Sequence, residues 1–298
     1  MNKKIPLYNR TKKSIEYEKV FEQEFMDFVY GTRLGRQIEK RFIMKSAFSV
    51  FYGFLQRLPS SRGKIPEFIE NHGIDIDELE ESVSSFHCFN DFFKRRLRPE
   101  SRPIDSRKGI LVSPCDGRLL NYRLEHDVII PVKGREFSLS ELLGDKSVAD
   151  RFNGGCCLIY RLAPMDYHRF CYIDNAVQHP TKIVNGGLHS VSQLSLEQMI
   201  PVFIENYREF SLLSTETFGD VVHMDVGALV VGKIVQNNRG KVNVMRGEEK
   251  GHFEFGGSTI ILLFEEGQVE IDKDIVEYSE LGTETVVKMG ESVGIANR

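Results

Sequence analysis

The chain reads Phe-Glu-Phe-Gly-Gly-Ser-Thr-Ile-Ile-Leu-Leu-Phe from Phe253 to Phe264. From Ile260 onward the residues are bulky or β-branched and apolar without interruption, which predicts a buried strand. The glycines before it, Gly256 and Gly257, allow a backbone with positive φ and a close approach of other groups. The stretch therefore predicts a tight turn that leads directly into a buried strand.

A serine at the exit of such a turn can react with its own backbone. The hydroxyl of Ser258 can attack the carbonyl of Gly257 and replace the peptide bond by an ester. β-Elimination of that ester would split the chain and leave dehydroalanine at position 258, which hydrolyses to a pyruvoyl group. Gly-Gly-Ser-Thr by itself is more often a simple turn than a cleavage site, so the rest of the chain must distinguish the two interpretations.

The composition is that of an ordinary globular protein. Of the 298 residues, 41% are hydrophobic and 28% are charged, which excludes a disordered chain and allows one large domain or two. The five cysteines show no Cys-x-x-Cys spacing, which argues against a disulfide framework or a zinc site and indicates a reducing compartment. We expect no signal peptide and no membrane-spanning segment.

Basic residues gather in the N-terminal part of the chain. Residues 1–64 hold an excess of Lys and Arg, although the whole chain has a net charge of −4. A polar segment over 1–13 precedes a helical pattern from Ile15 to about Leu58, which Gly31 and Gly35 break or bend. The stretch after these glycines has one apolar, aromatic-rich face flanked by basic residues. Such a basic amphipathic helix packs on a domain core or lies in the interface of an anionic membrane, and the two uses are compatible.

Proline residues indicate a domain boundary near Pro103. Before it, Asn90 is expected to cap a helix over Asp91–Leu97, and after it the pattern changes to short strands and glycine turns. Ser138 begins a capping box for a short helix that ends at Gly144. Further strands are expected at 110–112, 128–132, 156–162, 181–184, 221–226, 228–235 and 241–244. The fold class is therefore α+β, with membrane-associating helices in 1–103 and a mainly antiparallel β catalytic domain in 104–298.

Self-cleavage by a serine requires a base and a group that orients the base. The sequence offers Asp116 in the turn Ser-Pro-Cys-Asp-Gly and His168 after an apolar strand. An Asp in such a turn often bonds its own backbone, and a single His is often structural. Sequence spacing cannot tell whether either residue meets Ser258.

The chain resembles the phosphatidylserine decarboxylases, which are pyruvoyl-dependent lipid enzymes, over nearly its whole length. The resemblance is carried by short blocks in a specific order, chiefly Phe89–Pro99, Ser113–Gly117, Leu162–Phe170 and Phe253–Phe264. The Gly-Gly-Ser-Thr form is that of a prokaryotic branch distinct from the Leu-Gly-Ser-Thr type. The resemblance implies self-cleavage into a β chain, 1–257, and an α chain, 258–298, whose first residue becomes the covalent pyruvoyl cofactor.

The resemblance also implies roles for individual residues. Asp116 matches the Asp of the self-cleavage triad, and His168 matches the first His of the pattern Asp-Tyr-His-Arg-x-His, which serves the decarboxylation step. The second His of that pattern, the proposed base for self-cleavage, is replaced here by Cys171. The base is then Cys171 as a thiolate, or one of His168, His179 and His189.

The implied reaction converts phosphatidylserine to phosphatidylethanolamine and CO₂ through a Schiff base between the pyruvoyl carbonyl and the substrate amine. The implied location is the cytoplasmic side of the cell membrane, as a peripheral protein. The implied partners are phosphatidylserine in an anionic membrane, the β and α chains of one precursor, and a second copy in a homodimer, without nucleic acid or metal.

Two alternatives remain open at this point. One is an unprocessed, non-catalytic homologue that only binds membranes or lipid, because Cys171 replaces the family His. The other is a pyruvoyl-dependent decarboxylase of a soluble amino acid, which would not need the basic amphipathic segment.

Overall fold

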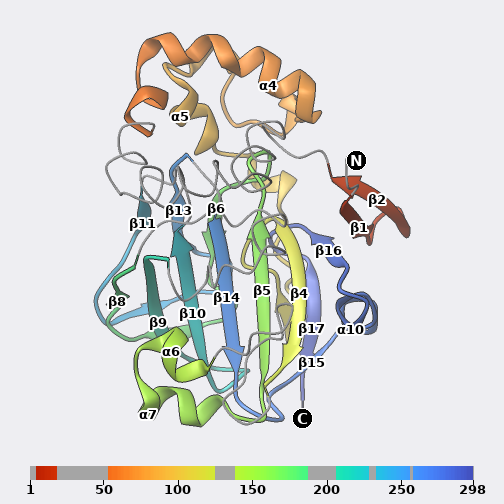
Figure 1. The fold of residues 1–298 in the computed structure, drawn as a ribbon, viewed down its shortest axis with the longest axis vertical. Coiled ribbons are helices and arrows are strands. Elements are labelled where there is room, and N and C mark those ends of the chain that lie inside the picture. Colours follow the sequence, from red (N-terminus) through yellow and green to blue (C-terminus); the bar gives the residue numbers. More distant parts are fainter. Residues whose placement is uncertain are drawn as a thin grey trace, which may run out of the picture.

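The computed structural model describes residues 5–18, 53–124, 138–186, 206–227, 233–255 and 258–297. Within these ranges the chain forms three β-sheets with short helices at their edges and at one end (Figure 1). Neighbouring strands are antiparallel there except β1 and β16, which are parallel. The α+β class with mainly antiparallel sheets is therefore confirmed. None of the helices in these ranges is long and apolar enough to cross a membrane.

The main sheet contains the strand predicted from the Gly-Gly-Ser-Thr stretch. Its strand order is β12-β7-β9-β10-β14-β5-β4-β16-β1-β2, with β8 paired to β9. The strands are β12 (Val242–Val244), β7 (Ala176–Gln178), β9 (Arg208–Thr215), β10 (Asp220–Gly227), β14 (Ser258–Phe264), β5 (Cys156–Leu162), β4 (Gly117–Arg123), β16 (Glu284–Val287), β1 (Ile5–Asn9), β2 (Ser14–Glu18) and β8 (Lys182–Val184).

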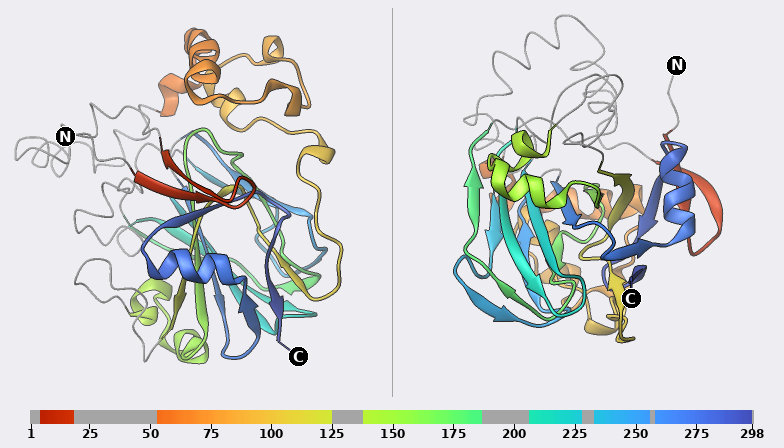
Figure 2. Two further views of the ribbon diagram at one scale, coloured as in Figure 1. Left: turned by 90° about the vertical axis from the view of Figure 1, so that its right-hand side faces the viewer. Right: turned by 90° about the horizontal axis from the view of Figure 1, so that it is seen from below.

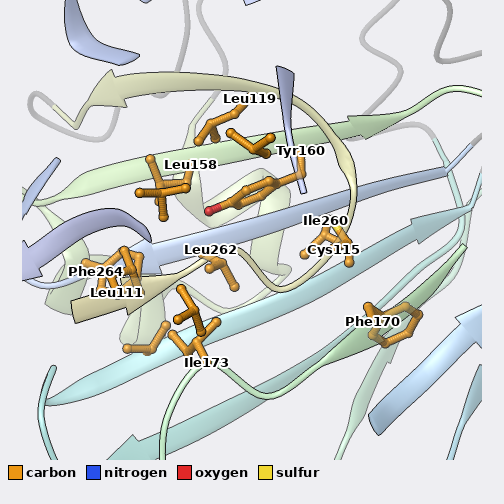
Figure 3. Close-up of a cluster of buried hydrophobic side chains, with 14 of the residues drawn as sticks. Leu111, Cys115, Leu119, Leu158, Tyr160, Phe170, Ile173, Ile260, Leu262 and Phe264 are labelled. Atoms are coloured by element: carbon orange, nitrogen blue, oxygen red, sulfur yellow. The ribbon is translucent and has the colours of Figure 1, made fainter. Parts of the chain in front are cut away.

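Strand β14 is buried at all seven positions, between β10 and β5. Its side chains alternate between two hydrophobic cores, one on each face of the sheet. Ile260 and Leu262 pack in the first core with Tyr160 (Figure 3), whereas Ile261 and Leu263 pack in the second. Because both faces are covered, the strand reads as a continuous apolar run, as predicted.

Two smaller sheets and the helices complete the described fold. One small sheet is β11 (Ile234–Gln236), β13 (Glu249–Phe253) and β6 (Arg169–Cys171), and the other is β15 (Val269–Ile271), β17 (Ser292–Ala296) and β3 (Ile110–Val112). The α-helices are α4 (Ile65–His72), α5 (Phe89–Phe93), α6 (Leu139–Leu143), α7 (Lys146–Ala149) and α10 (Lys273–Glu280). The 3₁₀-helices are η2 (Pro59–Lys64), η3 (Ile76–Glu78), η4 (Val83–Ser85), η5 (Pro99–Ser101) and η6 (Asp150–Phe152).

Most of the predicted elements that fall in the described ranges are present. The strands expected at 110–112, 156–162, 181–184, 221–226 and 241–244 correspond to β3, β5, β8, β10 and β12. The Ser138 capping box and the left-handed Gly144 at the end of α6 are confirmed. The strand expected at 128–132 lies outside the described residues, and only the last part of the one at 228–235 is described, as β11.

The helices α4 and α5 form a layer over the end of the main sheet at which β14 begins (Figure 1). Their aromatic side chains form a third hydrophobic cluster that also contains Tyr167 and Phe255, two residues of the β-rich part of the chain. In this cluster Phe255 meets the rings of Phe89 and Phe93 edge-on, with ring centroids 5.2 and 5.1 Å apart. The helical layer therefore contacts the turn that precedes Ser258.

The prediction of a helix beginning at Ile15 is wrong for residues 15–18, which belong to the hairpin of β1 and β2. In β2 the apolar side chains of Ile15 and Tyr17 are exposed, whereas Glu18 points inward and its side chain is 6% exposed between two arginines. The ion pairs compensate the charge of this inward-facing residue. Because the inward-facing position carries a charged residue and the apolar side chains are exposed, a hydrophobic pattern does not identify the inward-facing side of β2. The remainder of the predicted helix up to residue 52 lies outside the described residues.

The hairpin is attached to the part of the chain that follows residue 258. Figure 2 shows the hairpin beside α10. Arg10 bonds both Asp272 and Asp274 at 2.7 Å, and Tyr8 stacks on Tyr278 of α10 with ring centroids 3.8 Å apart. The N-terminal residues of the chain therefore help to hold the segment predicted to become the α chain.

Candidate active site

Ser258 is the first residue of β14 and is fully buried. The two neighbouring strands place Gly227 and Leu162 opposite it. Gly256 and Gly257, the glycines of the predicted cleavage turn, lie outside the described residues. The residues that precede these glycines, up to Phe255, are described, and hydrogen bonds hold them in place.

Two residues from different elements hold the segment that leads into the turn. The backbone N–H of Phe253 donates to the carbonyl of His168 at 2.9 Å. The backbone N–H of Phe255 donates to Oδ1 of Asn90, in α5, at 3.0 Å. Because β14 fixes the other end, both ends of the turn are attached to the framework.

Asn90 is therefore not the helix cap predicted from the sequence. Helix α5 begins at Phe89 and ends at Phe93, the residue before it is Cys88, and no side chain caps it. The Asn90 side chain is 3% exposed and bonds the turn instead. A buried backbone N–H needs a hydrogen-bond partner, and the Asn90 side chain serves the N–H of Phe255 instead of capping the helix.

His168 meets Ser258 directly. Its Nδ1 lies 3.1 Å from the Ser258 Oγ, and its Nε2 lies 3.1 Å from the carbonyl oxygen of Ala163. A carbonyl can only accept, so Nε2 carries the ring proton and Nδ1 keeps a lone pair that accepts from the Ser258 hydroxyl. The geometry thus selects the tautomer in which His168 can take a proton from Ser258.

The surroundings of His168 keep the ring neutral. Its side chain is fully buried and stacks on Phe93 with ring centroids 4.0 Å apart. Burial, reinforced by the charge of Arg95, lowers the pKa of His168 to about 3. The imidazole therefore carries no charge at neutral pH, and its Nδ1 is available as an acceptor.

The turn that carries His168 is closed by Asp166. The Asp166 backbone N–H donates to the Ala163 carbonyl at 2.9 Å, and the Ala163 N–H donates to the Asp166 carboxylate at 2.7 Å. Arg118 of β4 forms an ion pair with the same carboxylate. The carbonyl that orients His168 thus belongs to a doubly bonded turn anchored to the main sheet.

Asp116 lies in a different set of contacts. Its carboxylate accepts from Arg102 Nε at 2.8 Å and Nη2 at 2.7 Å, and from the backbone N–H of Met289 at 2.9 Å. Arg102 also bonds Glu78 at 3.0 Å. Across the described ranges no hydrogen bond joins Asp116 to His168 or Ser258. Asp116 thereby links the helical layer to the segment after β16.

Cys171 ends β6 and is 1% exposed. Burial raises the pKa of its thiol to about 12, so the sulfur is protonated at neutral pH. Its backbone N–H donates to the Pro114 carbonyl at 2.9 Å, and no hydrogen bond connects its side chain to Ser258 in the described part of the chain. Of the other histidines considered, His179 bonds Ser214 at 3.0 Å, and His189 lies outside the described residues.

Sequence reasoning missed three residues that surround this site: Asn90, Phe93 and Arg95. Their contacts with the turns on either side of the site and with His168 join segments at least 70 residues apart, which no local pattern reports. The available signal was that all three fall in the block Phe89–Pro99 that carried the family resemblance.

The comparisons with known proteins show to which family the chain belongs. Residues 89–295 match the family described as phosphatidylserine decarboxylase. A phosphatidylserine decarboxylase proenzyme of Clostridium botulinum is 43% identical over 291 residues, which cover 97% of this chain and 99% of the relative. Proenzymes of the same name from Clostridium perfringens and Clostridium beijerinckii are 42% and 41% identical over 97% of this chain, and 99% and 98% of their own lengths are covered. A match of this length and identity means that the chain belongs to the phosphatidylserine decarboxylase family.

Proposed function

We propose that the protein is a pyruvoyl-dependent phosphatidylserine decarboxylase whose chain cleaves itself between Gly257 and Ser258. The observation that carries the proposal is the hydrogen bond between the Ser258 hydroxyl and Nδ1 of the neutral, buried His168. A serine hydroxyl is a weak nucleophile unless a base accepts its proton, and this base is already in contact with it. The proenzymes that the chain resembles support the same reaction.

Self-cleavage begins with transfer of the Ser258 hydroxyl proton to Nδ1 of His168. Oγ then bonds to the carbonyl carbon of residue 257, the peptide C–N bond breaks, and the nitrogen of residue 258 takes the proton back from the imidazole. Loss of the Cα hydrogen of residue 258 as a proton forms the Cα–Cβ double bond, while the carboxylate of residue 257 leaves. Addition of water and loss of ammonia convert the resulting dehydroalanine to a pyruvoyl group.

The surroundings of Ser258 fit this group, because its side chain is shielded from water and bonded to a neutral histidine. The pyruvoyl group would supply a carbonyl that accepts electrons from the substrate's α-carbon as CO₂ leaves. His168 would take up at Nδ1 the proton that the substrate ammonium loses, and would return it to the α-carbon, because Nδ1 is the ring nitrogen that faces residue 258. Tyr167, 7% exposed and next to His168, is the second candidate donor.

We assign both self-cleavage and turnover to His168, which thus replaces the histidine that is absent at position 171. The raised pKa of the Cys171 thiol argues against a thiolate base at this position and so supports the assignment to His168. Asp116 acts on processing indirectly, since its contacts with Arg102 and Met289 hold the helical layer against the segment after β16.

Intact mass spectrometry of the purified chain tests the proposal. We expect two fragments, 1–257 and 258–298, the smaller one blocked by a keto group, and a single uncut chain for Ser258→Ala. Vesicles that contain carboxyl-labelled phosphatidylserine should release CO₂, whereas free serine should not. A folded wild-type chain that stays in one piece with Ser258 intact would show a non-catalytic homologue, and release from free serine would show a soluble substrate.

We further propose that residues 1–103 bring the enzyme to an anionic membrane surface as a peripheral protein. The basic excess of residues 1–64 supports this, as does the packing of the helical layer beside the turn before Ser258. Replacing Arg36, Lys40, Arg41 and Lys45 together by Gln should abolish flotation with phosphatidylserine vesicles, and undiminished flotation would contradict the proposal. Deletion of residues 1–64 would be a poor test, because it removes two strands of the main sheet.

A further inference from the structure

Arg95 is a buried cation without a carboxylate partner. The residue is 4% exposed, and in the described part of the chain no Asp or Glu lies within ion-pair distance of its guanidinium. Its Nη2 donates to the carbonyls of Met165 and Asp166 at 2.8 and 3.1 Å, and its Nε has no hydrogen-bond partner among the described residues. The guanidinium also lies over the ring of Phe92, 5.1 Å from its centroid.

Such a group is costly for a protein to keep. Burial lowers the pKa of Arg95 to about 10, so it still carries its charge at neutral pH, while Asp116 and Asp166 act on that charge only from beyond ion-pair distance. A neutral donor could bond two carbonyls with a smaller desolvation cost. We therefore look for a role of this charge at His168, whose turn Arg95 contacts.

The two carbonyls that Arg95 bonds belong to the turn that orients His168. On the other side of this turn, Arg118 holds the carboxylate of Asp166, and the Ala163 carbonyl accepts the Nε2 proton of the histidine. The turn is thus held between an arginine that follows α5 and an arginine of β4. A displacement of the turn would move His168 away from Ser258.

The charge of Arg95 also acts on the imidazole. Two cations face the ring, Arg95 and Arg118, and both disfavour its protonated form, with the effect of Arg95 the larger. Arg118 is neutralised by its ion pairs with Glu18 and Asp166. The other polar group at the ring is the Ser258 hydroxyl from β14, and Phe93 covers one ring face. Asp116 and Asp166 act on Arg95 rather than bonding the ring.

We propose that Arg95 is a positioning residue for His168: it fixes the turn through the carbonyls of Met165 and Asp166 and keeps the imidazole neutral, in the tautomer that accepts the Ser258 proton. The inference rests on the proposed self-cleavage. It adds that a charge which touches neither the reacting bond nor Ser258 helps burial to keep the base neutral.

The test separates the hydrogen bonds of Arg95 from its charge. Arg95→Lys keeps the charge, but a single ammonium lacks the planar fork of the guanidinium, so we expect self-cleavage to slow by about tenfold or more with an unchanged acid limb of the pH–rate profile. Arg95→Gln keeps one amide donor and removes the charge. The pKa of His168 should then rise, and the acid limb should move to higher pH. The rate is read as the fraction of uncut chain on a denaturing gel after a refolding jump at each pH.

Arg208→Gln is the matched control. Arg208 is 2% exposed, burial also lowers its pKa to about 10, and it bonds the carbonyls of Glu141 and Leu142. It pairs with Val226, whose side chain packs in the second core, on the sheet face opposite to that of Ile260. We expect its loss to leave both the cleavage rate and the acid limb unchanged.

A second measurement does not depend on cleavage. In a Ser258→Ala background the chain stays whole, and nitrogen NMR of labelled histidines reports the tautomer and titration of His168 directly. With Arg95 present the ring should stay neutral with the proton on Nε2, and with Gln at this position it should titrate at higher pH.

The inference would be overturned if the wild type and Arg95→Gln had the same acid limb in the pH–rate profile and the same titration of His168. It would also be overturned if Arg95→Lys cleaved at the wild-type rate. A wild-type chain that never cleaves would instead refute the proposed function, while the NMR titration would still decide the role of Arg95.

Discussion

Replacement of His168 by Gln should nearly abolish self-cleavage. Gln is close in volume and can still donate to the Ala163 carbonyl, but it has no basic nitrogen at 3.1 Å from the Ser258 Oγ. A positioned general base contributes roughly 10²- to 10⁴-fold to a rate. At about 1.4 kcal/mol for each factor of ten, its loss raises the activation free energy by about 3–5 kcal/mol. Pulse-labelled chain followed on a denaturing gel measures this directly.

The same substitution also removes the stacking of the ring on Phe93, which is worth about 0.5–1.5 kcal/mol of folding stability. His223→Gln is therefore the matched control, because His223 is another fully buried histidine, 3.2 Å from Asp225, without a contact to Ser258. It should lose comparable stability and still cleave.

The result distinguishes two roles of the histidine. A His168→Gln chain that is cut at the wild-type rate but releases no CO₂ would refute His168 as the base for self-cleavage and leave it only the decarboxylation step. A chain that is neither cut nor folded would be uninformative alone, so thermal unfolding is measured on the same preparation.

Three further predictions follow from buried groups. Burial lowers the folded-state pKa of His168 to about 3 and that of His252 to about 4, so the unfolded chain takes up more protons below about pH 6.5 and stability should fall on acidification from there towards pH 4. Urea unfolding of the uncut Ser258→Ala chain across this range checks it, and a flat profile would contradict it. Cys171→Ser should leave the cleavage rate unchanged within about twofold, since the thiol is protonated; a large loss would restore the cysteine as a candidate base. Glu284→Gln removes one carboxylate from the buried ion pair between Glu284 and Arg161, whose N···O distance is 2.5 Å. It should lower the free energy of unfolding by about 3–5 kcal/mol, measured with denaturant, and the loss should be near the lower end because Glu18 still pairs with Arg161.

Local patterns predicted those elements whose determinants lie within a few residues. The Ser138 capping box joins residues three apart, and β14 is apolar at every position from Ile260 because it is buried on both faces. Both were predicted correctly, since neither depends on a distant partner. The helix predicted from Ile15 was wrong for β2, because its inward position carries Glu18, which two distant arginines make tolerable.

Asn90 was assigned the wrong partner for a related reason. A helix cap is a local bond, whereas its actual bond to the Phe255 amide spans 165 positions. Only the folded chain brings these two groups together. The sequence therefore indicated that Asn90 accepts a hydrogen bond from a backbone N–H, but not that the N–H is that of Phe255.

By itself the sequence determined the central buried strand, the α+β class, the candidate nucleophile Ser258 and the family. The tertiary structure decided which titratable side chain meets that serine, because His168 and Ser258 are 90 positions apart and become neighbours only where the loop after β5 folds over the start of β14. It also decided the state of that base, since burial and the charge of Arg95 set the pKa of the imidazole. Desolvation and the field of a distant charge depend on packing in space, and no pattern along the chain reports either of them.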